Sequence, residues 1–293
     1  MRLLDLWNLS QKPTLSFELF PARSPKAAER FEAALDELVD LNPDFVSVTF
    51  GAGGSTREGS YKLIEKLIRD KELDVLGYFA GYGLSPDEIT SILESYKDLG
   101  VGNILIVRGD EPRELQGWEP HPESFPYASD LMAFVKPRFD FCFGCAGYPE
   151  GHIDAESKGD DLGFLKMKVN NGAEYIITNY AYDNQFFYDF VERCQSAGID
   201  VPILPGVMPI YSIKMMNMLA GLCGATITNK LQNGIDDLPE GDSKALQQFG
   251  IEFAVEQCAD LIKNGVVGLH IYTMDRSNSA VPIVNRLREM DLL

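Results

Sequence analysis

Apolar residues along the chain recur in short runs, each followed by a longer amphipathic stretch. We predict strands at eight of these runs: 14–20, 45–50, 73–79, 103–109, 141–147, 175–181, 201–207 and 267–273. Helices are predicted between and after them, at 25–40, 57–70, 86–99, 129–136, 157–171, 183–197, 211–222, 242–264 and 278–290. Local signals agree with these boundaries, since Ser85-Pro86 precedes one helix and Gly100 follows it.

This alternation of strands and helices is typical of a parallel sheet. Strongly apolar strands indicate a sheet that is covered on both faces. Eight such units favour an α/β fold, a single (β/α)8 TIM barrel in which residues 1–293 form one domain. An open doubly wound sheet is the alternative, weakened because no GxGxxG motif follows the first strand.

The first predicted strand carries a glutamate within the apolar run LSFELFP. Side chains alternate along a strand, so Glu18 and Ser16 share the face opposite Phe17. An unpaired buried carboxylate is costly, and Glu18 should therefore be protonated, paired with a cation, or placed at the mouth of a cleft. In a barrel, its position near the strand's carboxyl end predicts the mouth.

Polar residues also follow the other predicted strands. They include Thr49, Arg108, Asp110, Tyr148, His152, Asn179 and Arg276. Each has a structural interpretation: Glu18 can pair with Arg108 or Arg276, His152 can cap a loop, and Asn179 can satisfy backbone groups. Their joint placement at one end of a barrel favours a ligand site.

Composition excludes several classes of function. The formal net charge of -18 argues against binding to nucleic acid and to anionic membranes. No run reaches the ~18 apolar residues of a membrane-spanning helix, and the first residues do not resemble a signal peptide. The five cysteines are scattered and odd in number, which indicates reduced thiols and a cytoplasmic location.

Metal and redox chemistry through cysteine or histidine is not favoured. The pair CFGC at 142–145 can be redox-active or bind a metal, but its flanks predict a buried strand with the two sulfurs on opposite faces. The three histidines form no HxH or HExxH pattern, so we expect no catalytic metal. His121 is expected to face solvent and His270 to lie in the core.

A series of motifs resembles one known family. In order, they are SFELFP, FVSVTFGAGGS, RGD (108–110), YASDL, GYPEGH, LKMKVNNGA, PGVMPI and YTMDRS. From about residue 14 to residue 290 the chain is similar to the bacterial-type methylenetetrahydrofolate reductases. That resemblance implies a flavin-dependent barrel that reduces 5,10-methylenetetrahydrofolate to 5-methyltetrahydrofolate, or catalyses the reverse oxidation, with FAD as cofactor and NADH or NADPH as the possible donor.

The resemblance also implies roles for individual residues. Glu18 matches the general acid, and Asp110 matches an aspartate near the flavin and the folate pterin. Both, with Asn179 and Arg276, are expected to bind the tetrahydrofolate substrate. The implied flavin contacts are Thr49, Ala52, Tyr78, Arg108, Gly109, Asp110, Ala128, Tyr148, His152, Asp161 and Lys168. Asp161 and Lys168 lie two helical turns apart and can face the same way.

The chain departs from the family pattern around the cofactor and the electron donor. Tyr78 replaces a histidine that touches the flavin, and Asn179 replaces a glutamine. Phe164 and Met167 stand where an asparagine and an arginine are frequent, and Ile213 stands where an aromatic commonly stacks on NADH. These changes put direct use of NADH in doubt.

Three alternatives remain open. The chain can be a non-redox folate-binding barrel of the methyltransferase type, a reductase subunit that receives electrons from a partner protein, or a scaffold subunit, which the retained Glu18 and Asp110 argue against. The family further implies a homo-oligomer. The donor, the physiological direction and the oligomeric state do not follow from the residues.

Overall fold

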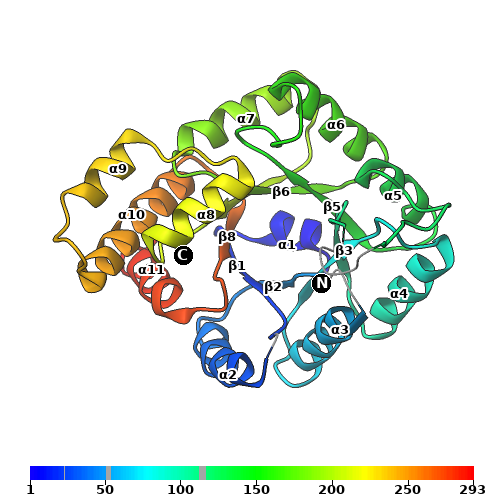
Figure 1. Ribbon diagram of the computed structural model, residues 1–293, viewed down its shortest axis with the longest axis horizontal. Helices are drawn as coiled ribbons and strands as arrows, with labels where there is room; N and C mark the ends of the chain where they lie inside the picture. The colour runs from blue at the N-terminus through cyan, green and yellow to red at the C-terminus, as the bar shows by residue number, and fades with distance from the viewer. Residues whose placement is uncertain (23, 51–53, 112–116) are drawn as a thin grey trace.

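The strands close into a barrel with helices around it (Figure 1). The computed structural model describes residues 1–22, 24–50, 54–111 and 117–293. Strands follow one another around the barrel in chain order, every neighbouring pair is parallel, and β8 pairs with β1. The predicted (β/α)8 barrel is thus confirmed, and the open doubly wound alternative is wrong.

All eight predicted strands are present, within a few residues of the expected limits. They are β1 (Thr14–Leu19), β2 (Phe45–Val48), β3 (Val75–Ala80), β4 (Asn103–Val107), β5 (Cys142–Gly147), β6 (Tyr175–Tyr180), β7 (Ile203–Val207) and β8 (Gly268–Tyr272). The pattern located them because parallel strands covered on both faces are almost continuously apolar.

The predicted helices are also present. They are α2 (Pro25–Val39), α3 (Gly54–Arg69), α4 (Pro86–Asp98), α5 (Ala128–Val135), α6 (Lys158–Asn170), α7 (Asn184–Ser196), α8 (Ile213–Cys223), α10 (Ser243–Lys263) and α11 (Ser277–Glu289). Ser85 forms a capping box with Glu88 at the start of α4, and Gly100 takes a positive φ of 90° after its end. Two further helices, α1 (Leu3–Leu9) and α9 (Asn229–Asp236), were not predicted.

Alternation along the strands divides the core into two layers. Outward side chains such as Phe17 and Ile104 pack beneath the helices, whereas inward ones such as Leu105 and Tyr175 fill the barrel. Cys142 belongs to the inner cluster and Cys145 to the outer one, as the spacing in CFGC predicted. Both thiols are buried, which favours packing over redox chemistry.

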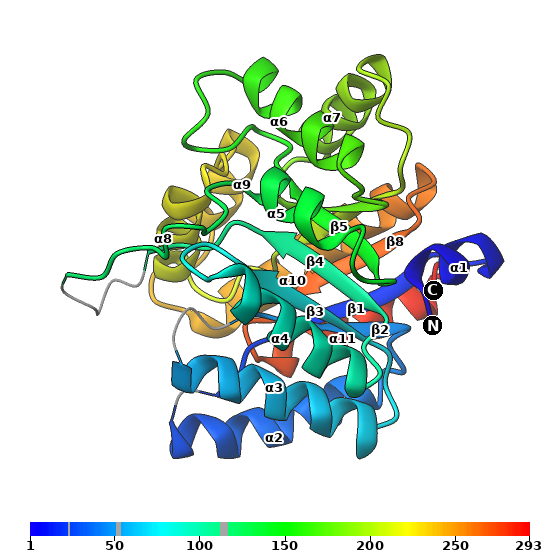
Figure 2. The same cartoon turned by 90° about the vertical axis from the view of Figure 1, so that its right-hand side faces the viewer.

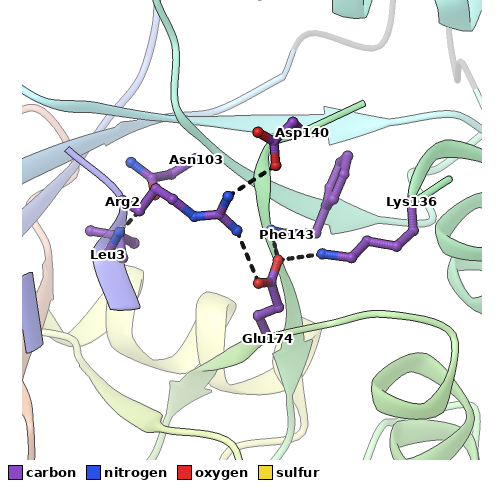
Figure 3. Close-up of polar contacts among 7 residues, drawn as sticks. All are labelled: Arg2, Leu3, Asn103, Lys136, Asp140, Phe143 and Glu174. Carbon is purple, nitrogen blue, oxygen red and sulfur yellow. Dashed lines mark hydrogen bonds and ion pairs between the residues drawn. The ribbon is translucent and has the colours of Figure 1, made fainter. Parts of the chain in front are cut away.

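Helix α1 closes the end of the barrel where the strands begin, away from α8 (Figure 2). Leu3 joins the inner cluster, and the Trp7 indole donates to Thr14 Oγ1 at 3.0 Å. This end also carries a network of paired charges (Figure 3). The Glu174 carboxylate accepts hydrogen bonds from Arg2, from Lys136 and from the Phe143 backbone N–H.

No helix in the described ranges is long and apolar enough to cross a bilayer. The same ranges hold no group of three or more His, Cys, Asp or Glu side chains placed to bind a metal ion.

Candidate active site

Glu18 lies inside the barrel, near the carboxyl end of β1. Its neighbour Phe17 packs in the outer layer, and Ser16 shares the inner face, where its hydroxyl contacts His270. The Glu18 residue is 6 % exposed. Its register partners are Ser47 of β2 and Tyr272 of β8. Strand alternation therefore places Glu18 at the mouth, as predicted.

The surroundings of Glu18 favour its protonated form. Burial raises the pKa of Glu18 from 4.5 to about 7, and the Asp275 carboxylate nearby acts in the same direction. A hydrogen bond with the Tyr78 hydroxyl acts against them. A carboxyl with this pKa retains its proton in a substantial fraction of molecules near neutral pH, as a general acid requires.

The arginines that were considered as partners of Glu18 lie against aromatic rings instead. The Arg108 guanidinium carbon is 4.1 Å from the centre of the Tyr82 ring, and its Nε donates to the Pro126 carbonyl. The Arg276 guanidinium carbon is 5.3 Å from the centre of the Tyr211 ring. No cation is among the groups that shift the pKa of Glu18. In the described part of the chain, the structural alternative of an ion pair with Arg108 or Arg276 is therefore wrong.

A cavity of about 250 Å³ opens at the mouth beside β2, β3 and β4. Four residues implied by the family resemblance line it, namely Thr49, Tyr78, Gly109 and Asp110. The φ of Gly109 is 84°, and a Cβ on this glycine would lie 2.8 Å from the Ala80 Cβ. Glycine is therefore needed here, both for the backbone conformation and for the close approach of β3 and β4. The Tyr78 hydroxyl links this cavity to Glu18.

A second cluster lies across the mouth, after β5 and on α6. The Tyr148 and His152 rings are 4.6 Å apart between centres, and Lys168 Nζ lies 5.9 Å from the centre of the Tyr148 ring. Burial raises the pKa of Asp161, whereas the nearby Lys168 and His152 side chains act in the opposite direction. Asp161 and Lys168 thus face the same way from α6, as their spacing predicted.

The remaining predicted residues are less informative. Ala128 is the first residue of α5. The Asn179 amide accepts from the Tyr180 N–H at 3.0 Å and donates to the Cys223 carbonyl at 3.5 Å, which matches the structural alternative of satisfying backbone groups. Ala52 lies outside the residues that the structure describes.

Three polar residues near the mouth had no assigned role in the sequence. Asp275 accepts from the Phe20 N–H at 2.9 Å, and burial raises the pKa of Asp275 to about 6. Arg57 Nε and Arg193 Nη1 are buried donors without a protein acceptor in the described structure. Arg57 lines the cavity, and the Arg193 charge acts on Asp161. Asp275 follows β8 within YTMDRS, so its strand-end position was the available signal.

Three of the five departures from the family pattern lie at exposed positions on α6 and α8. Phe164 is 58 % exposed, Met167 48 % and Ile213 43 %. His121 is exposed and His270 fully buried, both as predicted.

Comparisons with known proteins agree on one family. The model of the family described as methylenetetrahydrofolate reductase matches residues 2–288. The 5,10-methylenetetrahydrofolate reductase of Escherichia coli (strain K12) is 33 % identical over 273 residues, which cover 93 % of this chain and 90 % of that protein. Methylenetetrahydrofolate reductase (NADH) 1 of Arabidopsis thaliana is 32 % identical over 287 residues. That match covers 94 % of this chain but 48 % of the plant protein, so the chain spans about half its length.

A solved structure supports the fold alone. An uncharacterised protein from Clostridium thermocellum that binds two copies of 5-methyl-5,6,7,8-tetrahydrofolic acid superposes with a TM-score of 0.61 at 17 % identity. The match covers 98 % of this chain and 100 % of that one.

Proposed function

The chain belongs to the methylenetetrahydrofolate reductase family, and we propose that it interconverts 5,10-methylenetetrahydrofolate and 5-methyltetrahydrofolate. We further propose that residues 1–293 act as one catalytic domain. The observation that carries the proposal is the buried Glu18 carboxyl, which has a pKa of about 7 and is linked through Tyr78 to a cavity at the barrel mouth.

In this reaction Glu18 acts as the general acid. Its proton goes to N10 of the substrate, the C–N bond of the five-membered ring breaks, and a cationic 5-iminium group remains on the folate. Asp110 lines the cavity and places a carboxylate where it can stabilise this cation electrostatically. Asn179 and Arg276 contact the folate in this proposal.

The residues at the mouth fit a flavin adenine dinucleotide cofactor. Arg57 lines the cavity, and its Nε is a buried donor that lacks a protein acceptor in the described chain. In the cluster across the mouth, Arg193 Nη1 is a second such donor and Lys168 adds a cation. Charged donors of this kind suit the anionic pyrophosphate of the cofactor. Thr49, Tyr78 and Gly109 line the cavity available to a ring. When bound, the flavin supplies the hydride that the iminium carbon accepts.

The remaining flavin contacts proposed from the family stay with this assignment. They are Ala52, Arg108, Asp110, Ala128, Tyr148, His152 and Asp161. Tyr148 and Asp161 lie beside Lys168 and His152 packs against Tyr148, which supports a binding role for the whole group.

The electron donor is proposed to be a nicotinamide nucleotide, because the plant relatives carry NADH in their names. One observation favours a second candidate, electron delivery by a partner protein. Ile213, at the start of α8, is an exposed aliphatic residue where the family commonly has a stacking aromatic. Fast bleaching of the flavin on stopped-flow mixing with NADH would exclude this second candidate.

An anaerobic titration of the purified protein tests the proposed function. We expect the absorbance spectrum of an oxidised flavin, which 5-methyltetrahydrofolate bleaches and 5,10-methylenetetrahydrofolate restores. NADH and NADPH are added in separate titrations to identify the donor. A protein that binds methyltetrahydrofolate but neither contains nor takes up FAD would instead be a non-redox folate-binding barrel.

A further inference from the structure

Side chains join β8 to β1 beyond the last backbone pair of the two strands. That pair is Glu18 with Tyr272. Just after it, the Thr273 hydroxyl donates to the Glu18 carbonyl at 2.7 Å. The Asp275 carboxylate in turn accepts from the Phe20 N–H at 2.9 Å. These two bonds hold the main chain of β1 at the acid itself and two residues after it.

The backbone after β8 adopts an unusual turn between these two side chains. Met274 and Asp275 have positive φ angles of 51° and 56°. This left-handed conformation is unfavourable for residues with a Cβ, and methionine has no short polar side chain to compensate for it. Thr273 holds the turn, because its hydroxyl oxygen accepts from the Asp275 N–H at 3.2 Å and its carbonyl accepts from the Arg276 N–H at 3.0 Å. Strained backbone that is held in this way is found most often at functional sites.

The other edge of β1 is held by backbone alone. The Thr49 N–H donates to the Leu19 carbonyl at 3.1 Å, directly after Glu18. The main chain around the acid is therefore fixed on both sides, by the backbone of β2 on one and by the Thr273 and Asp275 side chains on the other.

The same turn leads to Arg276. Its guanidinium lies over the Tyr211 ring, and the Tyr211 hydroxyl donates to the Tyr272 carbonyl at 3.2 Å. The acid and the arginine are thus both tied to the short segment that ends β8.

We propose that Thr273 and Asp275 are positioning residues, which fix the place of Glu18 relative to Arg276 and hence relative to a folate that both contact. The inference rests on the proposed function for its purpose, because only there do Glu18 and Arg276 act on one substrate. A misplacement of about 1 Å in a reacting geometry can lower a rate by about 10²-fold. Neither positioning residue has to touch the folate for its loss to reduce the rate.

Thr273→Val removes the hydroxyl and keeps the shape of the side chain. We expect the rate constant of flavin oxidation at saturating 5,10-methylenetetrahydrofolate to fall by about 10- to 100-fold, because the Glu18 carbonyl loses its donor. Thr273→Ser restores the hydroxyl and should return the rate constant to within about threefold of the wild type.

Thr14→Val is the matched control at the opposite end of the same two strands. The Thr14 hydroxyl is buried and donates to the Val267 carbonyl, just before β8, at 3.3 Å. Its loss should lower the denaturant midpoint but leave the rate constant within about twofold of the wild type, because the bond lies far from the acid. Equal losses of rate in Thr14→Val and Thr273→Val would overturn the inference.

Asp275 is tested through the Phe20 amide, without flavin or folate. Asp275→Gly removes the acceptor and adds no backbone strain, because glycine readily takes a φ of 56°. We expect hydrogen exchange of the Phe20 amide in the full chain to become about tenfold faster, measured by NMR with the signal assigned through Phe20→Leu. Asp275→Asn keeps an acceptor oxygen and should retain most of the protection.

Asp44 provides the matched control for this measurement, since its carboxylate accepts from the Leu15 N–H at 2.7 Å near the start of β1. Asp44→Ala should speed exchange at Leu15 and leave Phe20 unchanged. Unchanged exchange of Phe20 in Asp275→Gly, or an unchanged rate constant in Thr273→Val, would contradict the positioning role.

Two further outcomes are separable. Should Thr273→Val fail to fold, the rate constants of Asp275→Gly and Asp275→Asn replace it, and the larger loss is expected in Asp275→Gly. A wild type that does not react with the folate would refute the proposed function, whereas exchange at Phe20 still decides whether Asp275 holds β1.

Discussion

Two glutamates at opposite ends of the barrel have opposite environments. Glu174, where the strands begin, accepts hydrogen bonds from Arg2 and Lys136 and is 24 % exposed in its side chain. Glu18, where the strands end, is more deeply buried and has Asp275 rather than a cation among the groups that perturb it. The charge at the closed end is neutralised, and the charge at the open end is not.

This difference indicates that Glu174 stabilises the fold, whereas Glu18 is placed to take part in chemistry. A paired carboxylate keeps its ionised form and helps to hold segments together, whereas an unpaired buried one holds a proton that it can give away. In the proposed function, the free-energy cost of burying an unpaired carboxyl falls at the barrel mouth, where a substrate can accept its proton. Substitution of Glu18 should therefore mainly reduce catalysis, and substitution of Glu174 should mainly reduce stability.

The largest expected effect is on catalysis. Glu18→Gln should lower the rate of flavin oxidation by 5,10-methylenetetrahydrofolate by about 10²–10⁴-fold, because the amide cannot protonate N10. Single-turnover absorbance measures this rate, with flavin content as a check on integrity. Glu174→Gln should stay within about twofold of the wild type, and equal losses in both variants would remove the distinction between the two ends.

The next effect is on stability as a function of pH. Because the pKa of Glu18 is raised from 4.5 to about 7, this carboxyl binds more protons in the folded state than in the unfolded state between these values. Its contribution to stability should therefore fall as pH rises through this window, by about 3 kcal/mol. The raised pKa of Asp275 acts in the same direction and the lowered pKa of His270 in the opposite one, so the contribution of Glu18 is measured as the difference between the wild type and Glu18→Gln in denaturant midpoints at a series of pH values. A difference that stays constant across this window would contradict the assignment.

A smaller effect is expected at the closed end. Glu174→Gln removes the charge that Arg2 and Lys136 share and should lower the free energy of unfolding by about 1–2 kcal/mol, since the site is part-exposed. The measurement is the shift in denaturant midpoint at an unchanged slope. A gain in stability would mean that desolvation of the carboxylate outweighs its pairing.

The smallest effect is expected at Asp140, which belongs to the same network but has a 96 % exposed side chain. Asp140→Asn should leave the midpoint unchanged within error, because an exposed ion pair is screened and contributes little. It serves as the matched control for Glu174→Gln. A loss as large as that of Glu174→Gln would show that the network acts as a unit.

The positions of the strands and the inward orientation of the Glu18 side chain could be predicted, because both depend on a local pattern with a period of two residues. Helices α1 and α9 could not. Helix α1 has seven residues, and its packing depends on a closed barrel end that exists only in the folded protein. Helix α9 has eight residues, includes Gly234 and is flanked by polar, glycine-containing segments that resemble loops.

The candidate site was predictable only in part for the same reason. Strand ends must meet at the mouth of a barrel, so the positions of Glu18 and Tyr148 followed from the fold. Partners did not follow, since nothing local indicates that Arg108 lies on Tyr82 or that Asp275 lies near Glu18. The replacement at Tyr78 was visible in the sequence, but its contacts with Ser47 and Glu18 depend on three strands closing at one register.

The filled interior of the barrel has a consequence for the turnover cycle of the proposed reaction. Beneath the mouth, a mainly apolar inner cluster occupies the barrel and offers no ready path for protons to reach Glu18. Once the proton of Glu18 has left with the product, its replacement is therefore expected to come from solvent through the cavity at the mouth. Release of the product and reprotonation of the acid would then use the same opening, and a tightly held product would delay both.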